Sequence, residues 1–559
     1  MQGYCLAAAV QPRGGKIVAA MELKGRLIDI IKREIYPAVI EIDAGKIQSI
    51  SRSEHGENRF ILPGLIDSHI HIESSMLNPG SFARAAVSRG TTAVVSDPHE
   101  IANVLGIPGV DYMINDASKV PLRFYFGAPS CVPATAFESS GAVIDSHGIC
   151  ELLERPSVRY LAEMMNFPGL IGDDQEVWRK INCAVKLGKP IDGHAPGLSG
   201  EALRKYVSAG ISTDHECTTI EEAREKIKLG MKILIREGSA ARNLDALKGL
   251  FRTDPDKIML CSDDLHPEML VRGHIGRLVA SLVSEGYDLF DVVRSCTINP
   301  AIHYGIETGL PLAGSPADLI LVDDPRTMNV CQTLIDGKKV YAEGRILFEY
   351  GGSEPVNNFK SSKIKKEEIL VEASASNLRI IEAIDGDLTT GESSCNVKKG
   401  EEVKPRIATD ILKIVVKDRY RDLKPATAFI RGFGLKAGAF AGSVSHDSHN
   451  IICIGTNDDD IVDAINTLVG SRGGLAVAKN KLIDFLPLPV AGLMSDEPAE
   501  KVAEKYQNLS KLVNSYGCTM SAPFMTLSFM ALLVIPRLKL SDRGLFDVGR
   551  FGYTVLFYD

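Results

Sequence analysis

The stretch ILPGLIDSHIHIESS, residues 61–75, places two histidines one residue apart directly after an apolar run. Side chains on a β-strand alternate between its two faces, so His69 and His71 are expected to point to the same side. Such a pair could share a metal ion, but it could equally be two ordinary histidines of a barrel interior or surface. The rest of the chain has to decide between these interpretations.

The composition of the chain excludes several classes of protein. Its 559 residues are 45% hydrophobic and 24% charged, which is typical of a folded protein with more than one domain. The net charge of −8, without a basic stripe, argues against nucleic-acid binding. No apolar run approaches the roughly 20 residues that cross a bilayer, and residues 1–15 lack the charged start of a signal peptide. The 11 cysteines include no C-x-x-C pair, which favours a reduced cytoplasmic protein with cysteines as small core residues.

Eight short apolar segments recur between residues 65 and 264, and helical spacing follows each of them. They read LIDSHIHI, TTAVVSDPHE, RFYFGAP, VRYLAEMMNF, PIDGHAPG, ISTDHECT, MKILIREGS and KIMLCSDD. Eight such units in roughly 240 residues match the size of an α/β fold of the (β/α)8 TIM-barrel type. A doubly wound open sheet is the alternative, but it rarely uses eight units of such regularity.

The flanks of this region predict different structures. Alternating strands with Asp/Gly turns occur in residues 20–62 and 312–350, which predicts one small β-sandwich domain built from both flanks. The last part of the chain predicts an α/β domain, and its clearest helix follows Asn457 as the capping residue. We expect residues 1–62 to begin the β domain, 63–310 to form the barrel, 311–350 to return to the β domain, 351–369 to be a linker and 370–559 to form the C-terminal α/β domain.

Polar side chains gather at the carboxyl ends of the predicted strands, where barrel enzymes place their active sites. Five of the 12 histidines fall there. The set comprises His69, His71, Asp97, His99, Glu100, Glu163, His194, His215, Glu216, Arg236, Glu237, Asp263 and Asp264. Four imidazoles with two carboxylates suit two divalent ions better than one. The alternatives are hydrogen-bonded barrel histidines and, for Glu163, a buried partner of Arg or Lys.

The residue types suggest how such a centre would work. A hydroxide held between two ions forms near neutral pH and is a nucleophile. Glu163 can bridge two ions because a carboxylate has two oxygens. Asp263 can bind one ion and carry a proton from the nucleophile to a leaving group. We favour Asp263 over Asp264 as the ligand because it ends the apolar run directly, and we expect Asp264 to support a ligand instead.

These motifs resemble those of the bacterial and archaeal adenine deaminases, a family of the amidohydrolase superfamily. The strand-end motifs are PGLIDSHIHIESSM, SDPHEIANV, AEMMNFPG, DGHAPGL, TDHE, IREGSAARNL and SDDLHP, and the tail motifs are GAFAGSVSHDSHNIICIG and LPLPVAGLMSD. The resemblance covers nearly the whole chain. It implies hydrolysis of adenine to hypoxanthine and ammonia in purine salvage.

The resemblance also implies a binuclear centre of manganese or iron, with zinc as a further option. His69, His71 and Asp263 would hold the first ion, His194 and His215 the second, and Glu163 would bridge the two. The bridging hydroxide would add to C6 of adenine, and Asp263 would pass its proton to the departing ammonia.

The residues that hold or protonate the purine ring are less well defined. Catalytic candidates are Asp97, His99, Glu100 and Glu237, although Asp97 and Glu100 could instead cap the following helix. Substrate-binding candidates are Arg236, Asp264, His446 and His449; the two C-terminal histidines could instead lie at a packing interface. Arg236 would orient a carboxylate or form a salt bridge.

We expect adenine and water as partners, no nucleic acid, no membrane, a homo-oligomer and a cytoplasmic location. Two other functions stay open. One is another cyclic amidine or amide hydrolase of the superfamily, similar to guanine deaminase or dihydroorotase. The other is a non-enzymatic, metal-stabilised scaffold.

Overall fold

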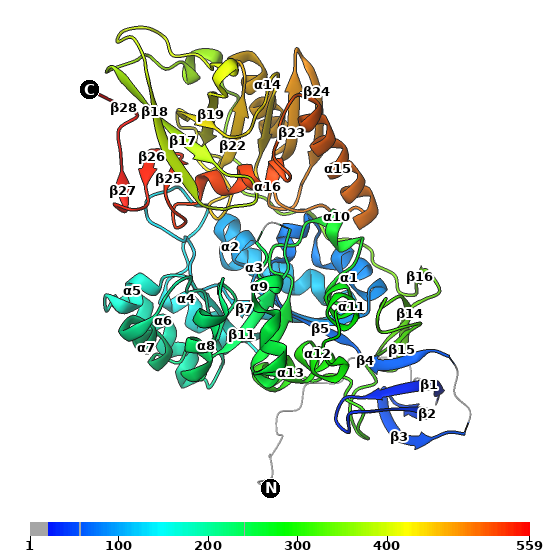
Figure 1. Ribbon diagram of the computed structural model, residues 1–559. Coiled ribbons are helices and arrows are strands. Elements are labelled where there is room, and N and C mark those ends of the chain that lie inside the picture. Colours follow the sequence, from blue (N-terminus) through cyan, green and yellow to red (C-terminus); the bar gives the residue numbers. More distant parts are fainter. Residues whose placement is uncertain (1–20, 55–57, 240) are drawn as a thin grey trace.

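The computed structural model describes residues 21–54, 58–239 and 241–559. The first 20 residues, in which the sequence argues against a signal peptide, lie outside this part of the chain. Figure 1 shows a small sheet beside the central barrel and a large C-terminal region over one end of it. Within the described residues, every helix is too short or too polar to span a membrane.

Eight parallel strands form the predicted barrel. They are β5 (Leu65–Ile70), β6 (Thr91–Ser96), β7 (Arg123–Ala128), β8 (Val158–Met164), β9 (Ile191–Gly193), β10 (Thr213–Asp214), β11 (Lys232–Arg236) and β12 (Ile258–Cys261). Strands β5 to β9 pair in sequence order, and so do β10 to β12. A backbone bridge between Ile70 and Asp263 brings the end of β12 beside β5. Ile66, Tyr160 and Met259, from three of these strands, share one buried core.

Helices cover the outside of this barrel. They include α1 (Pro79–Ser88), α2 (His99–Leu105), α3 (Ile107–Ala117), α4 (Ser146–Glu154), α6 (Gln175–Lys186), α7 (Gly200–Ser208), α8 (Ile220–Lys228), α11 (Ile275–Ser284), α12 (Leu289–Ser295) and α13 (Ile298–Tyr304). Helix α6 illustrates why these segments fold as predicted. Asp174 caps its first turn, and Val177, Ile181 and Ala184 lie on its buried face at helical spacing.

The two flanks pair into one eight-stranded sheet. Its order is β16 (Arg345–Ile346), β15 (Lys338–Ala342), β14 (Val330–Ile335), β13 (Leu319–Val322), β4 (Phe60–Pro63), β1 (Met21–Asp29), β2 (Glu34–Asp43) and β3 (Lys46–Arg52). Strand β13 joins the flanks by pairing with β4. A backbone bridge joins Lys46, at the start of the edge strand β3, to Pro316, which precedes β13. The sheet therefore curves back on itself, and both flanks pack on one apolar core.

The C-terminal region has mixed α and β structure, as predicted. Its nine-stranded sheet contains β17 (Asn377–Ala383), β18 (Thr390–Asn396), β19 (Leu412–Lys417), β20 (Ala426–Arg431), β21 (Ala439–Gly442), β22 (Ile451–Gly455), β23 (Gly474–Lys479), β24 (Leu482–Pro487) and β28 (Phe557–Tyr558). Helices α14 (Asp458–Ser471), α15 (Ala499–Ser515) and α16 (Pro523–Ser528) and a small sheet of β25 (Leu538–Ser541), β26 (Gly544–Asp547) and β27 (Gly552–Tyr553) complete it. Asn457 caps α14 by accepting from the Asp460 amide, as expected.

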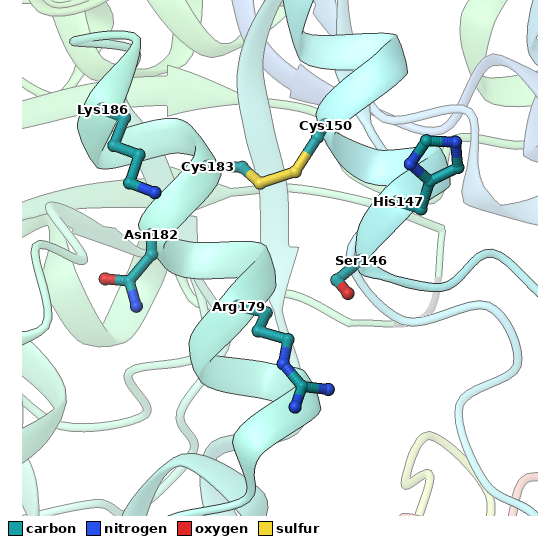
Figure 2. A pocket seen from close by; sticks show the side chains of 7 residues that line it. All are labelled: Ser146, His147, Cys150, Arg179, Asn182, Cys183 and Lys186. Atoms are coloured by element: carbon teal, nitrogen blue, oxygen red, sulfur yellow. A yellow bond between two sulfur atoms is a disulfide. The ribbon is translucent and has the colours of Figure 1, made fainter.

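The prediction that the cysteines are reduced core residues is wrong for one pair. Cys150 on α4 and Cys183 on α6 form a disulfide with Cα atoms 5.5 Å apart, whereas eight other described cysteines are free. The pairing escapes sequence analysis because 33 residues separate the partners and only helix packing brings them together. Both cysteines line a pocket of about 290 Å³. Figure 2 shows the disulfide among the side chains that surround this pocket. No predicted site residue lines that pocket.

Candidate metal centre

The structure gathers the six predicted metal ligands at the carboxyl ends of the barrel strands. His69 lies in β5 and Glu163 in β8, while the others follow their strands by one or two residues. Glu163 occupies the middle of the group. Its Oε2 is 2.9 Å from His194 Nδ1 and 3.1 Å from His215 Nε2. On the other side, its Oε1 is 3.5 Å from His71 Nε2.

Asp263 faces the two histidines of the opening motif. Its Oδ1 is 3.2 Å from His71 Nε2 and 3.5 Å from His69 Nε2. The residue has a left-handed backbone with φ of 54°, which Asp tolerates better than most residues. Its amide donates to the His69 carbonyl at 2.9 Å. The first strand therefore fixes the carboxylate that follows the last strand.

The donor set fits a pair of divalent cations. Groups such as His69–His71–Asp263 and His69–Glu163–His215 each bring their ligand atoms within 4.8 Å of one another. Both ring nitrogens of the fully buried His69 lack a hydrogen-bond partner. His71 Nδ1 lies 3.1 Å from the Asp97 carbonyl. A proton on Nδ1 would therefore leave Nε2 free as a ligand atom.

The electrostatics of the cluster favour bound positive charge. Burial alone would raise the pKa of Glu163, but hydrogen bonds from His194 and His215 outweigh it and hold that pKa well below its ordinary value. Burial opposes protonation of His215, yet Glu163 and Glu216 raise its pKa well above the usual range. The carboxylates thus stay ionised and draw cations or protons to the imidazoles.

Arg236, a predicted substrate-binding candidate, is engaged by two carboxylates. Its Nη1 donates to Asp263 Oδ2 at 2.6 Å, and its Nη2 donates to Glu216 Oε2 at 2.8 Å. Burial would raise the pKa of Asp263, but the guanidinium, His69 and His71 hold it well below its ordinary value. These contacts are salt bridges, and an orienting role of Arg236 toward Asp263 stays a prediction.

The second-strand motif lies beside the centre. His99 Nδ1 is 3.2 Å from Asp97 Oδ2 and 3.4 Å from Glu163 Oε1. Asp97 Oδ1 also accepts from the His99 amide at 3.1 Å, so it supports the start of α2. Glu100 is buried and accepts hydrogen bonds from His446 Nδ1 and His449 Nε2.

Two further candidates lie at the edge of the centre. Ser74 Oγ donates to Asp264 Oδ1 at 2.5 Å. Glu237 Oε1 is 3.8 Å from Arg242 Nε, and burial raises the pKa of Glu237. The contacts of these two carboxylates are therefore with the loops around the rim.

The sequence analysis missed a buried network below the metal ligands. Asp67 accepts from the His69 amide at 3.3 Å, from the Ser262 amide at 3.0 Å and from His274 Nε2 at 2.8 Å. His274 Nδ1 in turn lies 2.7 Å from Thr91 Oγ1. The local sequence signal for this network is Asp67, an acidic residue inside the predicted strand LIDSHI.

Comparisons with known proteins identify the family of the chain. The amidohydrolase family model matches residues 60–340, and the adenine deaminase C-terminal domain model matches residues 388–552. The barrel and its rim thus place the chain among the amidohydrolases. The chain is 52% identical to adenine deaminase of Sulfurovum sp. (strain NBC37-1) over 95% of its own length and 99% of the relative. It is 50% identical to that of Methanosarcina barkeri (strain Fusaro / DSM 804) over 96% and 99%.

The chain belongs to the adenine deaminase family, and it is a hydrolase that acts on a carbon–nitrogen bond. Solved structures are more distant. A beta-aspartyl dipeptidase from Fervidobacterium islandicum AW-1 aligns with a TM-score of 0.46 and 15% identity over 59% of this chain and 98% of that one. A 5-methylcytosine deaminase from Klebsiella pneumoniae aligns with a TM-score of 0.44 and 13% identity over 59% and 99%.

Proposed function

We propose that this chain hydrolyses adenine to hypoxanthine and ammonia at the rim of the barrel, as a cytoplasmic enzyme of purine salvage. The observation that carries the proposal is the position of Glu163, whose two oxygens face two different groups of imidazoles. The relatives named adenine deaminase support the choice of substrate.

Two divalent cations would bind here, and they would lower the pKa of a shared water so that it can attack C6 of adenine near neutral pH. His69, His71 and Asp263 would hold one cation, and His194 and His215 the other, with Glu163 between them. Mn²⁺ or Fe²⁺ is the proposed metal, and Zn²⁺ is the alternative.

Asp263 would act as the proton carrier of the reaction. Its Oδ1 faces the histidines and its Oδ2 is held by Arg236, so the carboxylate stays ionised and fixed in orientation. It would accept the proton of the attacking water and release it to the departing amino nitrogen. This transfer supplies the one proton that ammonia has more than the amino group had.

The purine ring must gain a proton on a ring nitrogen as C6 becomes tetrahedral. His99 is the proposed donor to the ring, and it would regain a proton from the C6 hydroxyl as the carbonyl of hypoxanthine forms. It lies between Glu163 and Glu100, and Asp97 and Glu100 raise its pKa well above the ordinary value although burial opposes this. Asp97 and Glu100 would position His99, and Glu237 would contact the ring from the opposite side of the rim.

An ammonia-release assay tests the proposal. The protein would be stripped of metal, reloaded with Mn²⁺ and assayed on adenine, guanine, dihydroorotate and an N-acyl amino acid. We expect release from adenine only, and only after reloading. If another compound is hydrolysed as fast as adenine or faster, the proposal that adenine is the substrate is wrong.

A further inference from the structure

The loop Ser443–Asn450 carries side chains of the C-terminal region into the barrel rim. It joins β21 to β22 and is held on several sides. The His446 amide donates to the Ser528 carbonyl at 3.1 Å, and the His446 ring stacks on Phe529 with centroids 4.5 Å apart. Asn450 Nδ2 donates to the Ser139 carbonyl of the barrel at 2.9 Å. The loop is therefore fixed against the barrel.

Asp447 is an acidic side chain of this loop to which the proposed mechanism gives no role. It is 4% exposed, and its Oδ2 has no hydrogen-bond partner. Its Oδ1 is 4.0 Å from His99 Nε2, whereas Nδ1 of the same ring is 3.4 Å from Glu163. The His99 ring thus lies between Asp447 and the predicted metal ligand Glu163. A buried carboxylate with a free oxygen is costly unless something pairs with it.

A third cation is a poorer explanation than a ligand with an N–H group. The group His99–Glu100–Asp447 has three ligand-type atoms close together. However, both oxygens of Glu100 already accept hydrogen bonds from His446 and His449. Asp447 would then be the main anionic ligand of such a cation. A buried divalent ion needs more ligands than this group could provide.

We infer that Asp447 binds the substrate by accepting the N–H of the five-membered ring of the purine, and so selects the free base over N9-substituted purines. The inference rests on the proposed function. If C6 is held at Glu163 and Asp263, N9 of the five-membered ring is among the purine atoms farthest from the metal ligands. Asp447 lies near the His99 nitrogen that faces away from Glu163, so it is placed to meet this part of the base. A nucleoside has no N–H at N9, so it would leave this buried carboxylate unpaired.

The surroundings of Asp447 agree with this role. Burial raises its pKa to about 6, and the neighbouring charges on Glu100 and His99 act in opposite directions. Its unpaired Oδ2 is available to accept a hydrogen bond from a bound ligand. Glu138, in the loop after β7, is also buried. Burial and, second to it, the charge of Asp447 hold the pKa of Glu138 well above its ordinary value.

The test compares adenine with 9-methyladenine, which lacks the N–H at N9, as substrates of the Mn²⁺-loaded full chain. We expect wild type to prefer adenine by at least about 100-fold in kcat/KM. Asp447→Ala should lower kcat/KM for adenine by about 10- to 100-fold, mainly through KM, and that for 9-methyladenine by less than about threefold. Asp447→Asn should lie between wild type and the alanine variant. Metal content should stay unchanged in both.

Asp459→Asn is the matched control, because Asp459 is an exposed residue of the same region that pairs with Lys366 at 2.9 Å. Equal losses for adenine and 9-methyladenine in Asp447→Ala would overturn the inference while the proposed function stands. Should the alanine variant not fold, the asparagine variant with an unchanged ratio would overturn it in the same way. Absence of adenine deamination by wild type would end both proposals.

Discussion

Replacement of Glu163 by Gln tests the centre most directly. The change converts one carboxylate oxygen into an amide nitrogen, which cannot ligate a cation. In the wild-type protein, the two carboxylate oxygens of Glu163 lie within 3.5 Å of ring nitrogens of His71, His194 and His215. Without the bridge, His194 and His215 provide two protein ligands on their side, fewer than the roughly three of a catalytic site. We expect kcat for adenine to fall by at least about 1,000-fold, which equals about 4 kcal/mol of lost transition-state stabilisation.

The assay combines ammonia release with elemental analysis of the purified variant. Metal content should fall from about two equivalents towards one. Glu201→Gln is the matched control, since Glu201 lies on α7 with 90% of its side chain exposed and pairs with Arg204. The control should retain the wild-type rate and metal content. Near-normal turnover of Glu163→Gln with both metals bound would refute the bridging role.

Four further substitutions probe other parts of the molecule. His446→Ala and His449→Ala should each lower kcat/KM for adenine by at least about 10-fold, because each removes a donor to the buried Glu100; rates equal to wild type would favour simple packing. Arg236→Met should move the acidic limb of the kcat/KM profile to higher pH, because the pKa values of Asp263 and Glu216 lose the cation that lowers them; an unmoved limb would contradict this. Burial lowers the pKa of Lys539 from 10.5 to about 7 in the folded state. Between these two pH values the unfolded chain binds a proton at Lys539 that the folded chain does not bind. The free energy of unfolding should therefore rise with pH in this range. Urea unfolding should therefore show a gain from pH 7 to pH 9 that is about 2 kcal/mol larger for wild type than for Lys539→Met.

The barrel and its histidines could be predicted because they depend on local periodicity. Alternation along a strand places His69 and His71 on one side, and the ends of parallel strands must meet at one rim. Glu163 and Asp263 follow from the same rule, although they are 100 residues apart in the sequence. The ion pairs of Arg236 were less predictable, because a side chain of that length reaches several carboxylates and packing selects among them.

The contacts between the barrel and the C-terminal region could not be predicted, since no local pattern relates Glu100 to a histidine 346 residues away. They nevertheless decide the charge of the site. Burial by itself would raise the pKa of Glu100 and favour its neutral form, but His446 and His449, with His99, hold that pKa well below its ordinary value. The barrel motif therefore supplies the carboxylate while the C-terminal loop keeps it ionised. An amidohydrolase barrel without this loop would have to leave Glu100 solvated or protonated, so the C-terminal region contributes to the electrostatics of the site as well as covering it.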